Sequence, residues 1–479
     1  MEAGSDGASG QESSYLDKRK LKAGAAGWIL LAGLGVSYVI SGDYAGWNFG
    51  LAEGGWGGLL IATALMATMY SCMVLGIAEM ASALPVTGAG YGFARRALGP
   101  LGGFATGTAI LIEYAIAPAA IVVFIGGYVE SLDILGITAG WPLYLAFYAV
   151  FVGVHIYGVG EALKLMFVIT GIAVVGLIIF VVAMIGQFDA SNLTDIPPSG
   201  AAGSSEFLPF GIAGVISAFV YGIWFFLAVE GVPLAAEESR DPKRDMPRGL
   251  IAAMLILLAF AALILITAPG GAGAQAIAES DNPLPDALGE ALGSDSPVRS
   301  IVNYVGLAGL IASFFSIIFG YSRQLFALSR AGYLPQALSV TSEKRRTPVI
   351  ALIVPGAIGF ALAALTEKGD LLINIAVFGA TVSYVLLTAS HIVLRVREPD
   401  LERPYRTPGG VATTGVAFVL ACAAVIATFF VDQTAALITA GVFLALMAYF
   451  VLWSRHRLVA DAPEEEFDAV DRAEADLSG

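Results

Sequence analysis

The chain contains twelve long apolar stretches, most of which reach the roughly 20 residues that a helix needs to cross a bilayer. Hydrophobic residues make up 57% of the chain and charged residues 13%, whereas a soluble domain has about 25% charged residues. This excludes a soluble enzyme, and the lack of alternating segments of about ten residues excludes a transmembrane β-barrel. We predict an all-α polytopic membrane protein. The stretches are residues 23–50, 57–84, 100–130, 140–158, 162–186, 207–236, 248–268, 299–328, 348–365, 370–395, 411–431 and 434–455.

The distribution of Lys and Arg predicts which side of the membrane each loop faces. Of the 25 basic residues, 23 fall on one side, in the two tails, in alternate loops or at the helix ends beside them, and only Arg299 and Lys368 fall elsewhere. The positive-inside rule assigns the basic side to the cytoplasm. We therefore predict a multi-pass protein of the cell membrane with both termini in the cytoplasm. The net charge of −14 and the lack of a basic domain argue against nucleic-acid binding.

These stretches divide the chain into four parts. They are an N-terminal cytoplasmic tail (1–22), a transport core (23–395, with halves 23–186 and 207–395), two further helices (411–455) and an acidic cytoplasmic tail (456–479). The loop from Pro269 to Pro297 is rich in Gly, Pro, Asp and Glu, and we predict that it is solvated surface. The sequence leaves monomer and homodimer equally open.

Two of the predicted spans combine helix breakers with a carboxylate. The first contains Ser-Gly-Asp-Tyr-Ala-Gly-Trp-Asn at 41–48, and the sixth contains Ala-Val-Glu-Gly-Val-Pro at 228–233. Such segments occur at membrane depth only where the backbone lines a cavity or is buried in protein. The two spans are five apart, as two inverted five-helix repeats require, with the breaks meeting at a substrate site. We therefore predict that helices 1 and 6 are discontinuous.

Four carboxylates fall inside the predicted spans, whereas no Lys or Arg lies well away from a helix end, so we predict that these carboxylates have no basic partner. They are Asp43, Glu79, Glu113 and Glu230. Because a central carboxylate is costly by about 2.5 to 3.5 kcal/mol, each needs a proton, polar partners or a bound cation. A cationic ligand is the simplest common explanation, and neutral carboxyl groups hydrogen-bonded between helices are the alternative. Glu79 lies near the cytoplasmic end, where we predict a structural role.

Aromatic residues precede the second break. Trp224, Phe225 and Phe226 lie just before it, and an aromatic face attracts an ammonium group by about 2 kcal/mol or more when desolvated. Trp224 is the strongest candidate for such a contact. The alternative is that these side chains only pack between helices.

Several motifs resemble the amino acid-polyamine-organocation permease superfamily, over a region from about Leu21 to Arg406. They are IAEMASALPVTGAGY at 77–91, RRALGP at 95–100, AAEESRDPKRDMP at 235–247, and SR at 322–323 followed by SRAGYLP at 329–335. The resemblance implies a LeuT-like fold of 5+5 inverted repeats with two added helices, twelve in total. It also implies a transporter and not an enzyme.

The first break departs from the pattern of amino-acid transporters in this superfamily, which typically have a Gly-Ser-Gly run that receives the substrate carboxylate. Here the run is Ser41-Gly42-Asp43, and an ionised Asp43 would repel a carboxylate at close range. The segment 41–51 is similar to the ethanolamine permease branch, which implies ethanolamine as substrate. We predict import of a small cationic amine without a carboxylate by alternating access. Asp43 holds the ammonium, and Ser41, Gly42 and Tyr44 lie in the same break.

The same resemblance places further residues in the site. Glu113, Tyr114 and Pro118 match third-span residues that face the substrate, Trp224 matches a sixth-span gate, and Ala228 and Glu230 lie at the second break. Glu230 matches an acid that couples to protonation in some relatives, and Ser313 and Ser316 can offer sodium ligands. No cofactor or metal is expected beyond a coupling proton or sodium ion. The alternatives are an amino acid or polyamine transporter of the same superfamily, and a membrane sensor or channel that binds an amine.

Overall fold

A computed structural model of the chain describes residues 26–84, 88–133, 136–158, 160–342, 345 and 347–458, without the side chains of 160–164, 237 and 238. Ten of the described helices are long and apolar enough to cross a membrane, and two shorter apolar helices span Trp28–Val39 and Trp141–Tyr157. No strand occurs among these residues, and Ala26 forms an isolated bridge with Ser239. The protein is therefore all-helical and multi-pass. The predicted tail 1–22 and residues 459–479 lie outside the described residues.

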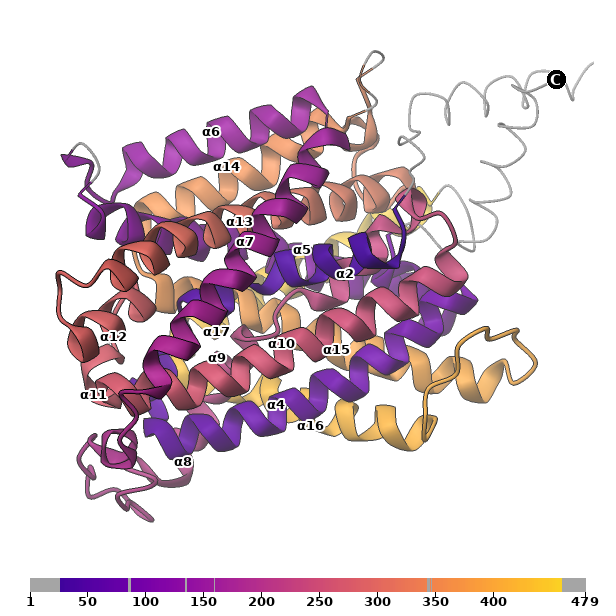
Figure 1. Ribbon diagram of the computed structural model, residues 1–479. Helices are drawn as coiled ribbons and strands as arrows, with labels where there is room; N and C mark the ends of the chain where they lie inside the picture. Colours follow the sequence, from indigo (N-terminus) through magenta and orange to yellow (C-terminus); the bar gives the residue numbers. More distant parts are fainter. Residues whose placement is uncertain are drawn as a thin grey trace, which may run out of the picture.

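The helices follow one another along the chain, and residues 186–210 form a long connection between α7 and α8 that contains η2 (Figure 1). Their bounds are α2 (Trp28–Val39), α3 (Ser41–Tyr44), α4 (Phe49–Ala83), α5 (Gly90–Ser131), α6 (Trp141–Tyr157), α7 (Gly160–Ile185), η2 (Ala190–Thr194), α8 (Gly211–Ser217), α9 (Phe219–Trp224), η3 (Val229–Glu238), α10 (Pro242–Ala272), α11 (Ala274–Ile277), α12 (Pro283–Leu292), α13 (Pro297–Arg330), η4 (Gln336–Ser339), α14 (Val349–Thr366), α15 (Gly369–Arg397), α16 (Val411–Val431), α17 (Gln433–Leu452) and η5 (Ser454–His456).

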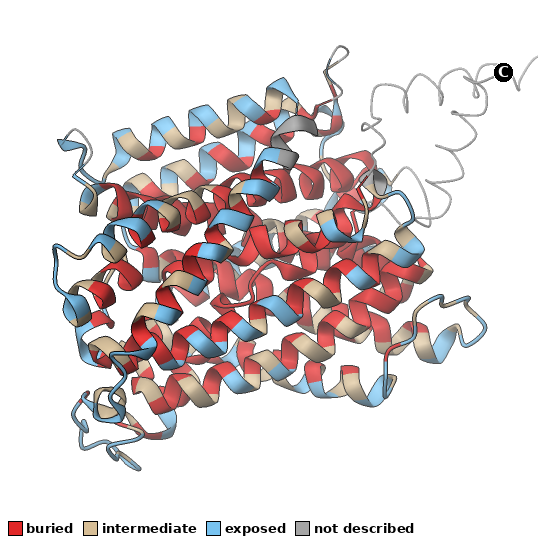
Figure 2. Ribbon diagram, in the orientation of Figure 1, coloured by how far each residue is buried: buried red, intermediate tan, exposed pale blue. Residues whose placement is uncertain are grey.

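Burial separates the central helices from those at the periphery. Helix α5 is buried along most of its length and shares the most extensive interface among the described helices with α15. The outer helices, such as α7, α16 and α17, expose many apolar side chains (Figure 2). Ile178, Val182, Val419 and Leu444 are examples, each at least 49% exposed. Contiguous exposed apolar surface of this kind suits a bilayer and not water.

The first predicted break is present in the structure. Helix α2 continues through Ile40 into the single turn of α3, after which Ala45 is extended and Gly46 has a φ of 94°. Helical hydrogen bonding resumes at Phe49, where α4 begins, and Gly55 (φ 65°) interrupts α4 close to the predicted start of the second span at residue 57. The left-handed backbone at these two glycines explains why the helix cannot run through.

The second predicted break follows α9. The chain leaves helical geometry at Ala228, which has a φ of 76°, and continues as the 3₁₀ helix η3. Pro233 lies inside η3, and a proline cannot donate the backbone hydrogen bond that an α-helix needs. The polypeptide therefore crosses the protein interior here without a continuous α-helix.

The loop from Pro269 to Pro297 is more ordered than predicted. Helix α10 extends to Ala272, and α11 and α12 follow. Ile277, Leu284 and Leu288 are fully buried, because each apolar residue falls on the inner face of a short helix packed against its neighbours. The prediction of solvated surface is therefore wrong for this face of the loop.

Candidate functional site

The first break touches the end of α9, just before the second break, at Gly42. A side-chain carbon at Gly42 would lie 2.4 Å from the carbonyl oxygen of Trp224, so only glycine allows this approach. The indole Nε1 of Trp224 donates a hydrogen bond of 2.9 Å to the carbonyl of Ala45. The contact joins the end of α9 to the extended segment after α3, and it places the irregular backbone of both spans side by side.

Asp43 lies within this junction and is completely buried. Among the described residues, neither of its carboxylate oxygens has a hydrogen-bond partner, and no Lys, Arg or His forms an ion pair with it. Buried carboxylates in proteins are normally paired or hydrogen-bonded, because desolvating a charge without compensation is expensive. Asp43 therefore needs either a proton or a cation from beyond the described residues to offset the charge of its carboxylate.

A second acidic site lies between α5 and η3. The carboxyl groups of Glu113 and Glu230 both face the hydroxyl of Tyr384, and we call them the carboxyl pair. Both residues are at most 5% exposed. Two carboxylates offer acceptors only, and two like charges close together in a buried site repel each other. Because neither residue has a basic partner among the described residues, the pair needs a proton or a bound cation.

Tyrosines and backbone surround the carboxyl pair. Tyr114 donates to Oε1 of Glu230 at 3.0 Å. The hydroxyl of Tyr384 lies 3.2 Å from Oε2 of Glu230 and 3.4 Å from Oε1 of Glu113, and it accepts a bond of 2.7 Å from Tyr70. The backbone of Ala228 lies beside the carboxyl group of Glu113. Helices α4, α5 and α15 therefore meet the second break at one polar cluster.

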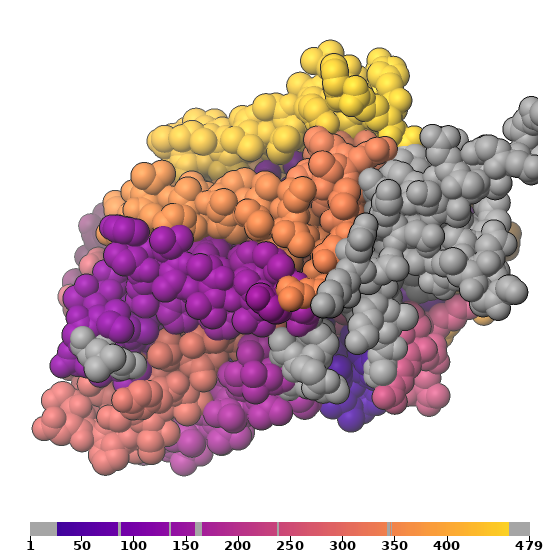
Figure 3. Space-filling view, turned by 90° about the horizontal axis from the view of Figure 1, so that it is seen from above, coloured from indigo at the N-terminus to yellow at the C-terminus, as the bar shows by residue number. Residues whose placement is uncertain are grey.

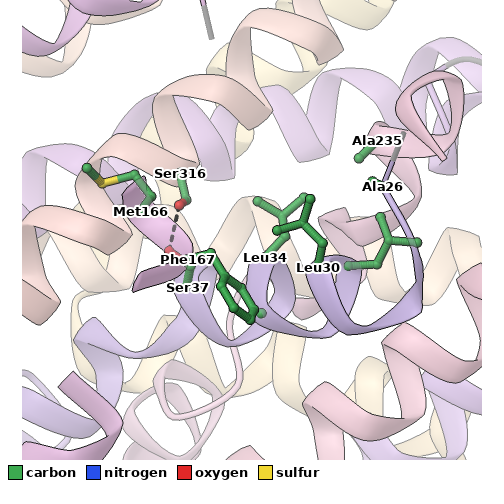
Figure 4. Close-up of a pocket in the computed structure, with 10 residues that line it drawn as sticks. Ala26, Leu30, Leu34, Ser37, Met166, Phe167, Ala235 and Ser316 are labelled. Atoms are coloured by element: carbon green, nitrogen blue, oxygen red, sulfur yellow. Dashed lines mark hydrogen bonds between the residues drawn. The ribbon is translucent and has the colours of Figure 1, made fainter. Parts of the chain in front are cut away.

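Serine hydroxyls form a third cluster between α2, α3 and α13. The Oγ atoms of Ser37 and Ser316 are 2.7 Å apart, and Ser313 donates to the carbonyl of Tyr38 at 2.7 Å. The Oγ atoms of Ser313 and Ser41 are 2.8 Å apart. A cavity of about 30 Å³ borders Ser37 and Ser316 and is otherwise lined by apolar residues (Figure 4). Such a volume is enough for a water molecule.

Two further predicted site residues, Tyr44 and Pro118, are buried in the structure. The hydroxyl of Tyr44 donates to the carbonyl of Ala173 in α7 at 2.7 Å, and its ring packs where side chains at Gly306 and Gly309 would otherwise lie. Tyr44 therefore anchors the first break to α7 and α13. Pro118 is buried in α5, and because it lacks an N–H it leaves the carbonyl of Tyr114 without its helical partner.

A salt-bridge cluster stands at the basic end of α4, and we call it the Glu79 cluster. Glu79 is buried and forms ion pairs with Arg395 at 2.6 Å and with Arg403 at 2.9 Å. Its carboxylate also accepts a hydrogen bond of 2.7 Å from the backbone N–H of Thr407. His391 lies 3.3 Å from the same carboxylate. The prediction that the four carboxylates lack basic partners is therefore wrong for Glu79. Its partners come from a helix end and a loop distant in sequence, and the structural role predicted for it fits this geometry.

Comparison with known proteins identifies the family of this chain. The sequence profile described as amino acid permease matches residues 27–453. The chain belongs to the amino acid permease family. Related proteins include an uncharacterized transporter of Rhizobium meliloti, 28% identical over 83% of this chain and 84% of the relative. Two Bacillus subtilis relatives are a branched-chain amino acid permease (28% identical, 76% of this chain and 79% of the relative) and a methylthioribose transporter (26%, 78% and 79%).

Family membership makes this protein a transporter of the membrane and not an enzyme. Within the permease, the structure brings most of the predicted residues together in three groups. Glu113, Tyr114, Ala228 and Glu230 form the carboxyl cluster, Ser41, Ser313 and Ser316 share the hydroxyl cluster, and Gly42 and Trp224 join the breaks.

Sequence reasoning missed residues whose roles depend on distant contacts. Tyr70 and Tyr384 complete the carboxyl cluster, although nothing in their local sequence marks them. Asn48 lies in the first break, and its side-chain amide donates to the carbonyls of Ile277 and Ser280 at 2.8 Å each. Its Oδ1 accepts the N–H of Gly46 at 3.1 Å. A polar residue in a break was the one available signal for Asn48.

Proposed function

We propose that this permease is a secondary transporter that imports a small amine lacking a carboxylate, with ethanolamine as the first candidate. The observation that supports this most directly is the carboxylate of Asp43, which is fully buried and has no donor among the described residues. Alternating access around the paired breaks would expose it to each side in turn. In the conformation observed, Asp43 is closed to both sides.

Charge favours an amine over an amino acid at this position. An ammonium about 4 Å from a carboxylate is attracted by roughly 4 kcal/mol at an effective dielectric constant of 20. The carboxylate of an amino acid would be repelled by a similar amount at the same distance. Ser41 is adjacent in the chain, and its Oγ lies 2.8 Å from that of Ser313, so it offers a polar group to the hydroxyl of ethanolamine.

Two clusters are candidates for the coupling ion. The carboxyl pair is buried and has no basic partner among the described residues, which supports proton coupling through Glu230 with Glu113 as its partner. The hydroxyls of Ser37 and Ser313 donate to backbone carbonyls, and the Oγ of Ser316 lies 2.7 Å from that of Ser37, an arrangement of the kind found at sodium sites beside broken helices. We favour the proton, because one shared proton removes the repulsion between the two carboxylates.

The proposed architecture has two inverted repeats, 23–186 and 207–395, followed by two helices within 411–455, twelve helices in all. The breaks five spans apart and the contact at Gly42 support it. We further propose that the protein lies in the cell membrane with its tails, 1–22 and 456–479, in the cytoplasm. The clustering of 23 of 25 basic residues supports that orientation.

The main alternative is a transporter of amino acids or polyamines with the same architecture. The branched-chain amino acid permease among the relatives favours an amino acid, whereas the methylthioribose transporter indicates that relatives are not confined to amino acids. An amine sensor or channel is the remaining alternative. A channel would show conductance faster than a carrier and no acceleration of exchange by substrate on the far side.

The deciding experiment is uptake of radiolabelled ethanolamine into proteoliposomes, with unlabelled alanine, arginine and putrescine as competitors. We expect saturable uptake that only ethanolamine-like amines block and that Asp43→Asn abolishes, because the amide keeps the shape and loses the charge. Asp295→Asn, at an exposed residue of the outer loop, is the matched control and retains uptake. Unchanged uptake by Asp43→Asn, or transport of alanine in place of ethanolamine, would overturn the assignment of Asp43.

A further inference from the structure

Four helices line an open apolar groove that the proposed transport mechanism does not use. Its volume is about 1040 Å³, and its walls come from α5, α15, α16 and α17. Leu101, Leu386, Cys422 and Ala448 each represent one of these helices, and the thiol of Cys422 is the one polar side-chain group in the lining. Figure 3 shows the yellow C-terminal part of the chain along one edge of the molecule, packed against orange segments, and α15 contacts both α16 and α17.

The groove occupies one half of the membrane thickness. On α17 it runs from Phe443 to Leu452, which is about 14 Å at the helical rise of 1.5 Å per residue. The hydrocarbon core of a bilayer is about 30 Å thick. The groove also includes Leu98 near the start of α5, and it reaches the basic end of the helices, where α17 ends and η5 begins. It therefore faces the lipid leaflet on the basic side.

Lipid hydrocarbon fits such a groove better than water does. A bound water needs two to four polar partners, and one thiol does not supply them. The groove opens to the surface, since Leu101 is 48% and Leu452 is 78% exposed. Lining atoms that face a void lose their dispersion contacts, so an acyl chain is the favoured occupant within a bilayer.

The basic end of the groove offers a site for a charged headgroup. Trp453 directly follows the groove residue Leu452 and is 54% exposed, and the guanidinium of Arg457 lies 4.2 Å from its ring. Arg455 is also exposed. Within the described part of the chain, no carboxylate pairs with either arginine. Tryptophan and arginine at this depth are typical of contact with lipid headgroups.

We propose that this groove binds an acyl chain of an anionic phospholipid, whose phosphate contacts Arg455 and Arg457. A second copy of the chain is a poorer occupant, because a two-fold interface would bring the same arginines of both copies together. The bound chain would support α5 and α15, which carry Glu113, Tyr114 and Tyr384. This inference does not depend on the identity of the transported substrate.

The test measures lipid retention by native mass spectrometry after titration with phosphatidylglycerol or phosphatidylcholine. Ala448→Phe fills the groove, whereas Ala445→Phe adds the same ring at an exposed position of α17 outside the groove. Arg455→Gln with Arg457→Gln removes the headgroup site, and Lys243→Gln with Arg244→Gln is the control for charge. Protection of Cys422 from a maleimide, in a Cys72→Ser background, reports occupancy independently.

We expect wild type and Ala445→Phe to retain phosphatidylglycerol in preference to phosphatidylcholine, and Ala448→Phe to lose it. Removing the arginines should weaken the affinity for phosphatidylglycerol by about fivefold for each residue, with little change in the affinity for phosphatidylcholine. Equal retention of the two lipids by wild type would refute the proposal, as would equal behaviour of the two phenylalanine variants. Conversion of a dimer to a monomer by Ala448→Phe would assign the groove to a second copy instead.

Discussion

Replacing Glu79 by glutamine should destabilise the permease far more than replacing a comparable carboxylate nearby. The side chain of Glu79 is 2% exposed, and it faces Arg403 (5%) and Arg395 (23%). Glutamine would leave both guanidinium groups without a counter-charge. Removing one partner of a buried ion pair costs about 3 to 5 kcal/mol, and the partial exposure of Arg395 places the expected cost near the lower end.

The matched control is Glu398→Gln. Glu398 accepts two hydrogen bonds of 2.9 Å from Arg96, and their side chains are 28% and 32% exposed. A solvent-exposed pair of this kind contributes about 1 kcal/mol or less. The two variants remove the same chemical group at the same end of the molecule, and they differ in how far the pair is buried.

The assay is the thermal unfolding midpoint of purified protein. The unfolding entropy of a 479-residue chain is about 1 kcal/mol/K, so we expect Glu79→Gln to lower the midpoint by about 3 °C and Glu398→Gln by about 1 °C or less. Combining Glu79→Gln with Arg403→Gln should cost less than the two single changes added together. Equal shifts for the two single carboxylate variants would refute the argument from burial.

Three further predictions follow from the site and the outer loop. Gly42→Ala should abolish uptake, because the new Cβ would lie 2.4 Å from the carbonyl of Trp224. Gly58→Ala should retain uptake, because its Cβ would have no neighbour closer than 3.6 Å. Retained uptake by Gly42→Ala would contradict the close contact with Trp224. Tyr384→Phe removes a hydroxyl bonded to the carboxyl pair, so uptake driven by a pH gradient should fall about tenfold or more. Tyr70→Phe should have a smaller effect, because the hydroxyl of Tyr70 bonds only Tyr384. A larger loss of uptake in Tyr70→Phe than in Tyr384→Phe would contradict the role given to the carboxyl pair and its tyrosines. Burial, and then the charge of Asp370, raises the pKa of Asp281 from 3.8 to about 6. The folded protein therefore holds a proton that the unfolded chain releases, and this stabilisation is complete below pH 3.8 and lost as pH rises through 6. Asp281→Asn should reduce the difference in unfolding midpoint between pH 5 and pH 7, and Asp295→Asn should leave it unchanged; identical pH profiles for wild type and Asp281→Asn would exclude the shift.

The helical architecture was predictable because it depends on local properties. Apolar length sets each span, and Gly and Pro beside a carboxylate marked both breaks, at 41–48 and 228–233. The predicted starts of the second and third spans, 57 and 100, fall close to Gly55 and Gly99, where the structure interrupts α4 and α5. Helix breakers act on their own backbone, so the sequence alone reveals them.

The composition of the polar clusters was only partly predictable, because it depends on which distant side chains meet. Glu113 and Glu230 were recognisable as intramembrane acids, but their meeting at the hydroxyl of Tyr384 joins residues far apart in the chain. Tyr384 has no local signal at all, since tyrosine is common in buried helices. The ion pairs of Glu79 were missed for the same reason, as Arg395 and Arg403 lie more than 300 residues away.

Asn48 connects the segment of α11 and α12 to the interior of the permease. Its amide binds the carbonyls of Ile277 and Ser280, between α11 and α12, while its carbonyl oxygen holds the backbone of Gly46 in the first break. If these bonds persist during transport, the break cannot move outward unless the segment around α11 and α12 moves with it. An antibody fragment that binds α12 and restrains it would then slow the transport cycle without contacting the substrate site.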